Sequence, residues 1–171
     1  MKEEKQMFTK IYYHVYSIRG HKYVIGATKK GLSFVGSRDQ DFEEVRRFYP
    51  ETELMDAEQI VNKYANQIRE YLLGKRQEFS LKLDISGTKF QESVWDQLKK
   101  IPYGQTSSYT EIAQSIGNPK AVRAVGSAVG KNPVLIVIPC HRVITKNQQL
   151  GNYRGGLAMK RELLTLEGAI N

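Results

Sequence analysis

The apolar run at positions 134–138, followed by Pro139-Cys140-His141-Arg142, constrains the fold of this chain more than any other stretch. Five consecutive apolar residues, four of them β-branched, are typical of chain that passes through a hydrophobic core. Pro139 has no backbone N–H and a fixed φ, so we predict a sharp turn there. Cys140, the only cysteine, follows the turn, and the adjacent imidazole and guanidinium favour a lowered pKa and a reactive thiolate. A lone cysteine beside apolar residues is more often a small buried hydrophobic residue, so the surrounding sequence has to decide.

The positive charge of the chain is concentrated in its second half. The formal net charge is +8, of which +6 falls in residues 86–171, where 11 lysines and arginines stand against 5 aspartates and glutamates. A basic excess attracts polyanions, most commonly nucleic acid, although many basic proteins bind none. The half that contains Cys140 is therefore the one expected to meet a polyanion.

Cysteine, histidine and apolar patterns exclude several classes of protein. One cysteine cannot form an internal disulfide, and the three histidines lack the spacing of metal ligands, so we expect no metal. No stretch approaches the roughly 20 apolar residues of a membrane-spanning helix. The N-terminal Met-Lys-Glu-Glu-Lys-Gln lacks the apolar segment of a secretory signal. We therefore expect no membrane association and a cytoplasmic protein, nucleoid-associated if its source is prokaryotic.

The first half has the pattern of a small sheet with helices. Runs of β-branched and aromatic residues between turn residues predict an antiparallel meander, with strands at 9–17, 22–28 and 32–35. Apolar spacing then predicts helices at 41–48 and 57–73, and a short strand at 81–85. We place a boundary near residue 86, between an N-terminal α/β supporting domain (1–85) and a C-terminal domain (86–171).

The second half begins with two capping boxes. Thr88 with Gln91, and Ser108 with Glu111, have the spacing of this motif. The first opens an amphipathic helix, and the second opens a short helix that ends at Gly117. The sequence therefore predicts two helices before residue 118.

A third helix follows after a tight Gly-Asn turn, which predicts a helix-turn-helix. Asn118 is a good N-cap and Pro119 a good first helical residue, so this helix is expected over 119–129. One face should enter the core through Val122, Val125 and Val129. The opposite face is basic but otherwise small, and consists of Lys120, Arg123, Ala124 and Ser127. Such folds can be purely structural, but the charge asymmetry favours DNA contact.

The end of the chain predicts a wing and a last helix. Residues 144–147 and 150–153 flank a polar turn and read as a small hairpin, and a helix over 156–166 ends at Glu167. A carboxylate at that end opposes the helix dipole and is usually just exposed. Here it could instead orient His141 and complete a Cys–His–acid relay. These patterns predict an α+β fold, with an N-terminal antiparallel β-sheet with helices and a mostly helical, winged helix-turn-helix C-terminal domain that carries Pro-Cys-His-Arg.

The residues around Cys140 resemble a known family. Pro139-Cys140-His141-Arg142-Val143 is similar to the active-site signature of the O6-alkylguanine-DNA alkyltransferases, also called methylated-DNA–protein-cysteine methyltransferases. The similarity extends through most of residues 88–168, including Gly117-Asn118-Pro119-Lys120-Ala121, Arg123-Ala124-Val125-Gly126 and Gly151-Asn152-Tyr153-Arg154-Gly155-Gly156. In the first half the resemblance is only architectural.

The resemblance implies a DNA repair protein that acts once per molecule. It would transfer an alkyl group, chiefly methyl, from O6 of guanine, and also from O4 of thymine, to Cys140 after the damaged nucleotide is flipped out of the duplex. It implies double-stranded DNA bound through the minor groove, a monomer, and no cofactor.

The resemblance also implies roles for individual residues. Cys140 would be the nucleophile, His141 would take its proton through a water, and Glu167 would hold the imidazole. Asn132 would be a hinge, Tyr109 would push the 3′ phosphate and donate toward guanine N3, and Arg123 would fill the gap left by the flipped base. DNA contacts would come from Thr110, Asn118, Lys120, Ala124, Ser127 and Lys146, and the guanine pocket would be lined by Val143, Tyr153 and Arg154.

Departures from the family pattern leave alternatives open. The zinc ligands that some members carry in the N-terminal domain are missing here, and Arg154 is bulkier than the serine of some members, which puts large adducts such as benzyl in doubt. A lesion sensor that binds DNA without chemistry is one alternative, although such sensors lack the cysteine. A cysteine hydrolase that uses Cys140 and His141 is another, although adjacent residues rarely bring an imidazole onto its neighbour's thiol.

Overall fold

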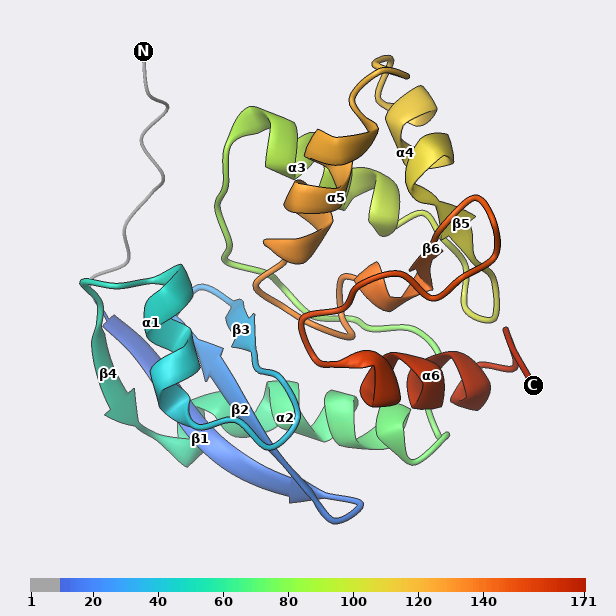
Figure 1. Cartoon of the computed structure of the whole chain (residues 1–171). Coiled ribbons are helices and arrows are strands. Elements are labelled where there is room, and N and C mark those ends of the chain that lie inside the picture. Colours follow the sequence, from blue (N-terminus) through green and yellow to red (C-terminus); the bar gives the residue numbers. More distant parts are fainter. Residues whose placement is uncertain (1–9) are drawn as a thin grey trace. The chain divides into compact units, whose positions relative to one another are not determined.

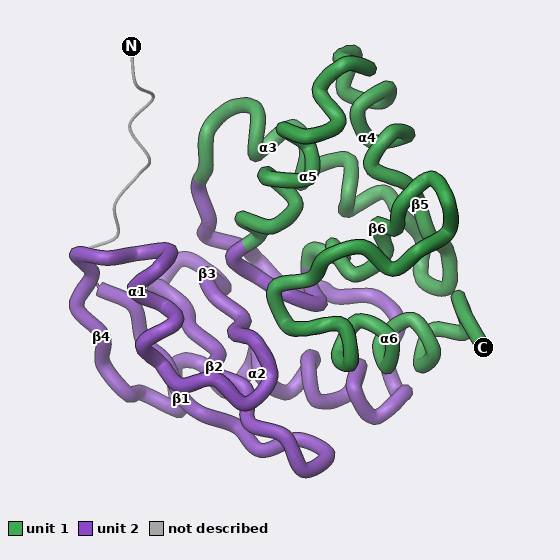
Figure 2. Tube along the Cα trace, in the orientation of Figure 1, with its two compact units in different colours: residues 1–4, 87–132, 138–171 green, residues 5–86, 133–137 purple. Residues whose placement is uncertain are grey.

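The computed structural model describes residues 10–171, which fold into two compact units (Figures 1 and 2). Of the described residues, one unit contains 10–86 together with Pro133–Val137, and the other contains Gly87–Asn132 and Ile138–Asn171. The apolar segment 133–137 belongs to the N-terminal unit. The chain therefore passes between the two units near residue 86 and again before and after this segment. Thr9, where the first strand was expected to begin, lies outside the described residues.

A four-stranded sheet with the order β3-β2-β1-β4 forms the centre of the N-terminal unit. Its strands are β1 (Lys10–Ile18), β2 (His21–Ala27), β3 (Leu32–Val35) and β4 (Glu53–Asp56). The first three form the predicted antiparallel meander, whereas β4 pairs in parallel with β1. The sequence did not predict β4, because its four residues lack the alternation of a half-buried strand and pair only at the sheet edge.

Helices cover both faces of this sheet (Figure 1). The helical elements are η1 (Phe42–Glu44), α1 (Val45–Phe48) and α2 (Glu58–Leu72), close to the two predicted helices. On one face, Ile11 packs with Val45 of α1. Tyr16 points to the opposite face by strand alternation, and its ring lies 5.7 Å from the guanidinium carbon of Arg69 in α2.

Two irregular segments pair with β3, the strand at one edge of the sheet, through isolated bridges. The predicted strand at 81–85 is wrong: it is a single bridge between Leu32 and Leu83. A second bridge joins Val35 to Val134, at the start of the apolar run. Val134, Leu135 and Ile136 are at most 1% exposed, which confirms that this run passes through a core. Ile136 has a φ of 73°, and this left-handed conformation prevents the run from continuing as a strand.

The C-terminal unit is mostly helical, as predicted. It contains α3 (Lys89–Leu98), β5 (Ser107–Ser108), α4 (Tyr109–Ser115), α5 (Val122–Gly130), η2 (Cys140–Arg142), β6 (Val143–Ile144) and α6 (Leu157–Leu166). Both predicted capping boxes are present, at the starts of α3 and α4. In its core, Trp95 of α3 donates a 2.9 Å hydrogen bond to the carbonyl of Ala128 in α5.

The helix-turn-helix of α4 and α5 is confirmed, but its connection is longer than predicted. The α5 helix begins at Val122 rather than at Pro119. Gly117, with a φ of 74°, ends α4, and the carbonyl of Asn118 then accepts a 3.0 Å bond from the backbone N–H of Ala121. This bond forms a turn, so Pro119 and Lys120 lie in the connection instead of the first helical turn.

The predicted wing hairpin is wrong. Val143 and Ile144 pair in parallel with β5, and no strand is assigned over residues 145–153. The polar turn is closed by a 2.9 Å bond from the Thr145 N–H to the Gln149 carbonyl. The carbonyls of Leu150 and Asn152, which a hairpin ladder would use, instead accept hydrogen bonds from the ammonium group of Lys160. Over the described part of the chain, no helix is long and apolar enough to cross a membrane.

Candidate active site

Cys140 lies at the first residue of η2, directly after the turn at Pro139, and is 3% exposed. The side-chain amide of Asn132 donates to the Cys140 sulfur at 3.1 Å and to the Ile138 carbonyl at 2.8 Å. Asn132 follows α5, so this pair of bonds connects the helix-turn-helix to the cysteine turn.

The Cys140 side chain borders a pocket of about 240 Å³. Tyr109 of α4 and the C-terminal half of α5 form one side, and the loop before α6 forms the other. The lining residues are Tyr109, Gly126, Val129, Gly130, Cys140, Asn152, Tyr153 and Arg154. Val143, which the resemblance placed in the pocket, is buried in β6 and is not among the lining residues.

The expected lowering of the Cys140 pKa is wrong for this structure. Burial raises the pKa of the thiol, because it removes water from the charged thiolate. The hydrogen bond from Asn132 and the positive charges of Arg154 and Lys160 act in the opposite direction but do not outweigh it. In this state Cys140 is a thiol at neutral pH, and a proton acceptor is needed to activate it.

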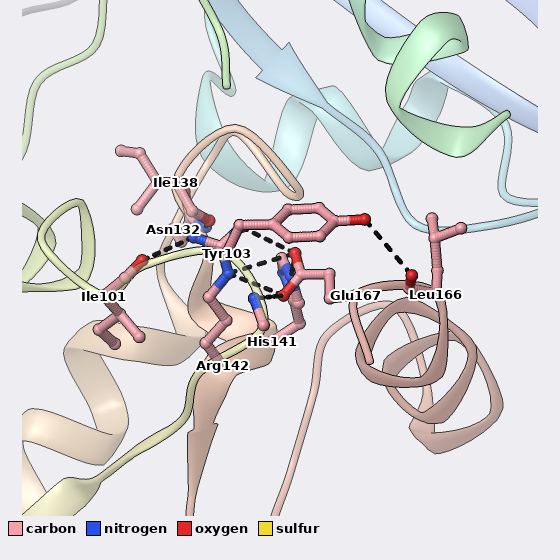
Figure 3. Close-up of polar contacts among 9 residues, drawn as sticks. Ile101, Tyr103, Asn132, Ile138, His141, Arg142, Leu166 and Glu167 are labelled. Atoms are coloured by element: carbon pink, nitrogen blue, oxygen red, sulfur yellow. Dashed lines mark hydrogen bonds and ion pairs between the residues drawn. The ribbon is translucent and has the colours of Figure 1, made fainter. Parts of the chain in front are cut away.

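Glu167 binds the two side chains that follow Cys140 in the sequence, His141 and Arg142 (Figure 3). His141 Nε2 lies 2.9 Å from Glu167 Oε1. Arg142 donates to the same carboxylate twice, from Nη2 to Oε1 at 2.7 Å and from Nε to Oε2 at 2.9 Å. The side chains of His141 and Glu167 are fully buried, so this paired charge is desolvated and strongly held. The predicted pairing of His141 with Glu167 is therefore present.

Arg142 explains why a carboxylate can end the last helix. Its guanidinium neutralises Glu167 and also donates from Nη1 to the Ile101 carbonyl at 2.7 Å. The ring of Tyr103 lies 5.8 Å from the guanidinium carbon, and its hydroxyl donates to the Leu166 carbonyl at 3.3 Å. The unfavourable helix dipole at Glu167 is thus offset by a buried cation.

The environment of His141 keeps its imidazole neutral. Burial lowers the pKa of His141, and the neighbouring carboxylate of Glu167 opposes that shift without reversing it. A neutral imidazole can accept a proton. The two pKa directions leave Cys140 as a thiol and His141 as a neutral imidazole at neutral pH.

Tyr109, the first residue of α4, is directed toward the pocket rather than into solvent. Burial raises the pKa of its hydroxyl, a negative charge on Cys140 would raise it further, and a backbone hydrogen bond from Asn152 opposes this. Gly151 has a φ of 72°, and a Cβ atom built there would lie 3.1 Å from the Tyr109 hydroxyl oxygen. Glycine is therefore required at 151 both for its backbone conformation and for close packing.

The residues predicted to contact DNA are mostly exposed. Arg123, Ala124 and Ser127 are exposed along α5, and Val125 and Val129 are buried on its other face, whereas Val122 is only half-buried. Asn118 and Lys120 are exposed in the connection before α5. Thr110 and exposed Lys146 come together at a second, more polar pocket of about 330 Å³ beside α4.

Lys160 is the clearest site residue that the sequence analysis missed. It is 0% exposed, and its ammonium group donates to the carbonyl of Val143 at 2.6 Å, to that of Asn152 at 3.2 Å, and to that of Leu150. Burial lowers its pKa to about 8. Its position three residues after Leu157 and four before Leu164, on the apolar face of α6, was the signal that could have found it.

Within residues 10–171, no group of three or more His, Cys, Asp or Glu side chains is placed to hold a metal ion. The site consists instead of one thiol, one imidazole, one carboxylate and the cations around them. The chemistry it offers is proton transfer and nucleophilic attack by sulfur.

The fold and site define a class of protein in which a helix-turn-helix unit carries a cysteine at a pocket. The next residue in the sequence is a histidine that pairs with a buried glutamate. Residues 89–169 match the DNA-binding domain of 6-O-methylguanine DNA methyltransferase, and residues 11–85 match its ribonuclease-like domain. The chain belongs to the 6-O-methylguanine DNA methyltransferase family.

Individual relatives cover nearly the whole chain. It is 47% identical over 161 residues to the inducible methylated-DNA–protein-cysteine methyltransferase of Bacillus subtilis (strain 168), an alignment that covers 92% of this chain and 90% of that protein. The corresponding protein of Methanosarcina mazei is 39% identical over 158 residues, with 92% and 97% covered. The crystal structure of Mycobacterium tuberculosis OGT in complex with DNA has a TM-score of 0.79 at 36% identity, and covers 93% of this chain and 92% of that one.

Proposed function

We propose that this protein repairs DNA by transferring an alkyl group, chiefly methyl, from O6 of guanine to the sulfur of Cys140, once per molecule. The observation that carries the proposal is the position of the Cys140 side chain at a pocket, held there by Asn132 and backed by the buried His141–Glu167 pair. Membership of the methyltransferase family supports it. O4-alkylthymine is proposed as a second substrate.

The transfer follows from the protonation states at the site. His141 takes the thiol proton of Cys140 through a water molecule, and Glu167 stabilises the imidazolium that forms. The sulfur attacks the alkyl carbon, an S–C bond forms, and the C–O6 bond breaks with its electron pair left on guanine. The product is a thioether, which water does not cleave under cellular conditions. The protein is therefore consumed by its reaction.

The damaged base must leave the duplex before the sulfur can reach it. Flipping costs a few kcal/mol, and least for a damaged pair. Tyr109, which lines the pocket, pushes the 3′ phosphate and donates toward guanine N3 as negative charge develops on the leaving base. Arg123, exposed on α5, enters the duplex in place of the flipped nucleotide.

The exposed face of the helix-turn-helix forms the DNA-binding surface. Small side chains at Ala124 and Ser127 allow α5 to approach the minor groove closely. Asn118, Lys120, Thr110 and Lys146 contact the DNA backbone. The monomeric state and the cytoplasmic location stay predictions from the sequence.

The test is incubation with a duplex that contains a single O6-methylguanine, followed by intact-mass measurement. We expect a gain of one methyl group per chain, mapped to the peptide with Cys140 and absent from Cys140→Ala. Arg123→Ala should slow methyl transfer to the duplex much more than to the free base O6-methylguanine, because only the duplex requires flipping. The proposal would be overturned if the mass of the protein did not change after incubation with a duplex shown to contain O6-methylguanine.

The same material separates the two alternatives. A lesion sensor would bind the damaged duplex without any change in mass, and Cys140→Ala would protect cells as well as the parent. A cysteine hydrolase would turn over a small ester many times per Cys140, whereas an alkyl acceptor stops after one equivalent.

A further inference from the structure

Within the described part of the chain, the pocket beside Cys140 is lined by one residue whose side chain is charged. Of the residues that line it, Arg154 is the one whose side chain is charged at neutral pH. The others contribute hydroxyl, amide, apolar or backbone surface, and Cys140 itself. A methyl group carries no charge with which a guanidinium could pair, so any direct contact of Arg154 with the adduct concerns charged adducts.

Arg154 is held close to the reacting sulfur. Its Nη2 donates to the backbone carbonyl of Asn132 at 2.9 Å, and the side-chain amide of that same Asn132 donates to Cys140 Sγ at 3.1 Å. Arg154 is half-buried and is one of the residues that line the pocket. Its positive charge also opposes the rise in the pKa of Cys140 that burial causes.

Two other charged groups near the site are held by hydrogen bonds outside the pocket. The Glu167 carboxylate is bound by Arg142 and His141, and the Lys160 ammonium donates to three backbone carbonyls. Neither Glu167 nor Lys160 lines the pocket. A group that enters the pocket therefore meets Arg154 as its charged neighbour.

We propose that Arg154 makes this pocket selective for guanine O6 adducts that carry a negative charge, of which carboxymethyl is the smallest example. The inference rests on the proposed alkyl transfer and names a substrate class for it. A carboxylate loses hydration in a pocket of this size and needs a cation to replace it. A guanidinium suits that purpose because it presents two parallel N–H donors to a carboxylate.

Transfer of a carboxymethyl group needs a nearby cation more than transfer of a methyl group does. Cys140 Sγ bonds to the CH₂ carbon of the carboxymethyl group, the C–O6 bond breaks, and its electron pair stays on guanine. The proton that leaves Cys140 ends on the released guanine, so the products are S-carboxymethylcysteine and guanine. During the step a sulfur anion approaches a carbon that bears a carboxylate. Arg154 offsets the repulsion between these two negative charges.

The experiment compares single-turnover rates on three otherwise identical duplexes. They contain O6-methylguanine, O6-carboxymethylguanine, or O6-carbamoylmethylguanine, whose amide has nearly the shape of the carboxylate but no charge. In the parent protein we expect the carboxymethyl adduct to react at least fivefold faster than the carbamoylmethyl adduct. This ratio of rates cancels any general effect of a substitution on Cys140.

Two variants of Arg154 separate charge from hydrogen bonding. Arg154→Gln keeps a long side chain and an N–H donor for the Asn132 carbonyl, and it should reduce the ratio to about one. Arg154→Lys keeps the charge without the planar fork and should retain an intermediate ratio. Measurement at raised salt should reduce the parent's ratio only slightly, because the group is half-buried.

The outcomes are distinguishable from a failure of the proposed function. If O6-methylguanine is not repaired at all, alkyl transfer itself is wrong. If the methyl adduct is repaired but the parent shows no preference for the carboxymethyl over the carbamoylmethyl adduct, or if Arg154→Gln keeps that preference unchanged, the role of Arg154 is wrong and the repair function stands.

Discussion

The side-chain amide of Asn132 donates a 3.1 Å hydrogen bond to the sulfur of Cys140. An N–H donor at this position stabilises the thiolate more than the thiol, and it lowers the pKa of Cys140 against the effect of burial. The same amide group also donates to the carbonyl of Ile138, which fixes the turn that presents the sulfur. Asn132 therefore controls both the position and the acidity of the nucleophile.

Replacement of Asn132 by alanine should slow alkyl transfer by about 10- to 100-fold, since a hydrogen bond to a charged group contributes about 1.5–3 kcal/mol. The measurement is the single-turnover rate on O6-methylguanine duplex at saturating protein. Because Cys140 is the only cysteine, iodoacetamide labelling without DNA reports on it alone, and its pH dependence should move to higher pH in the variant. Asn62→Ala, exposed on α2, is the matched control. An unchanged labelling curve would contradict the assigned role of Asn132.

Replacement of Glu167 by glutamine should lower the free energy of unfolding by about 3–5 kcal/mol, because it leaves the charge of Arg142 buried without its counter-ion. Denaturant titration measures the effect, with Glu51→Gln at an exposed position as the control. Replacement of Arg142 as well, in Arg142→Met with Glu167→Gln, should cost less than the sum of the two single changes. Strict additivity would show that the two side chains do not act as a pair.

The pH dependence of transfer should follow the protonation of His141. Burial lowers the pKa of His141, so the imidazole stays neutral as the pH falls through its ordinary value of about 6.5. The single-turnover rate should therefore hold through that value and decline only at lower pH, where the imidazole becomes protonated and can no longer accept the proton of Cys140. In Glu167→Gln the carboxylate that raises this pKa is gone, so the decline should begin at still lower pH. A rate that already halves at about pH 6.5 would contradict a buried, neutral base.

Replacement of Lys160 by methionine should lower the free energy of unfolding by about 1–3 kcal/mol, because three backbone carbonyls lose their donor. Lys100→Met, at an exposed position after α3, should change it little. The pKa of Lys160 is lowered to about 8, so between this value and about 10 the unfolded chain binds more protons than the folded one. The stability of the parent relative to Lys160→Met should therefore grow as the pH rises through this window. If the difference in unfolding free energy between the parent and Lys160→Met became smaller as the pH rose through this window, a lowered pKa of Lys160 would be contradicted.

Short-range patterns predicted much of the C-terminal unit correctly. The capping boxes at Thr88 and Ser108 depend on residues three apart, and both formed as the spacing indicated. The prediction of Asn118 as an N-cap and Pro119 as the first helical residue failed, because Asn118 forms a turn with Ala121 rather than a helix start. Local signals of this kind remain ambiguous wherever a turn and a helix cap use the same residues.

The wing and β4 show why strands were harder to predict than helices. A strand is completed by hydrogen bonds to another segment, and the sequence does not say which segment will provide them. Glu53–Asp56 forms hydrogen bonds with the edge of β1. Lys160 donates to the carbonyls that a wing hairpin would have used.

The sequence by itself determined the starts of α3 and α4, the buried passage at 134–138 and the turn that carries Cys140, because each depends on neighbouring residues and on local backbone preferences. Only the tertiary structure decided that Glu167 is neutralised by Arg142, 25 residues away, and that Lys160 is buried beneath the carbonyl of Val143, 17 residues away. It also decided that burial raises the pKa of Cys140 despite its basic neighbours. Desolvation and charge pairing depend on which distant groups exclude water together, and that information exists only once the chain has folded.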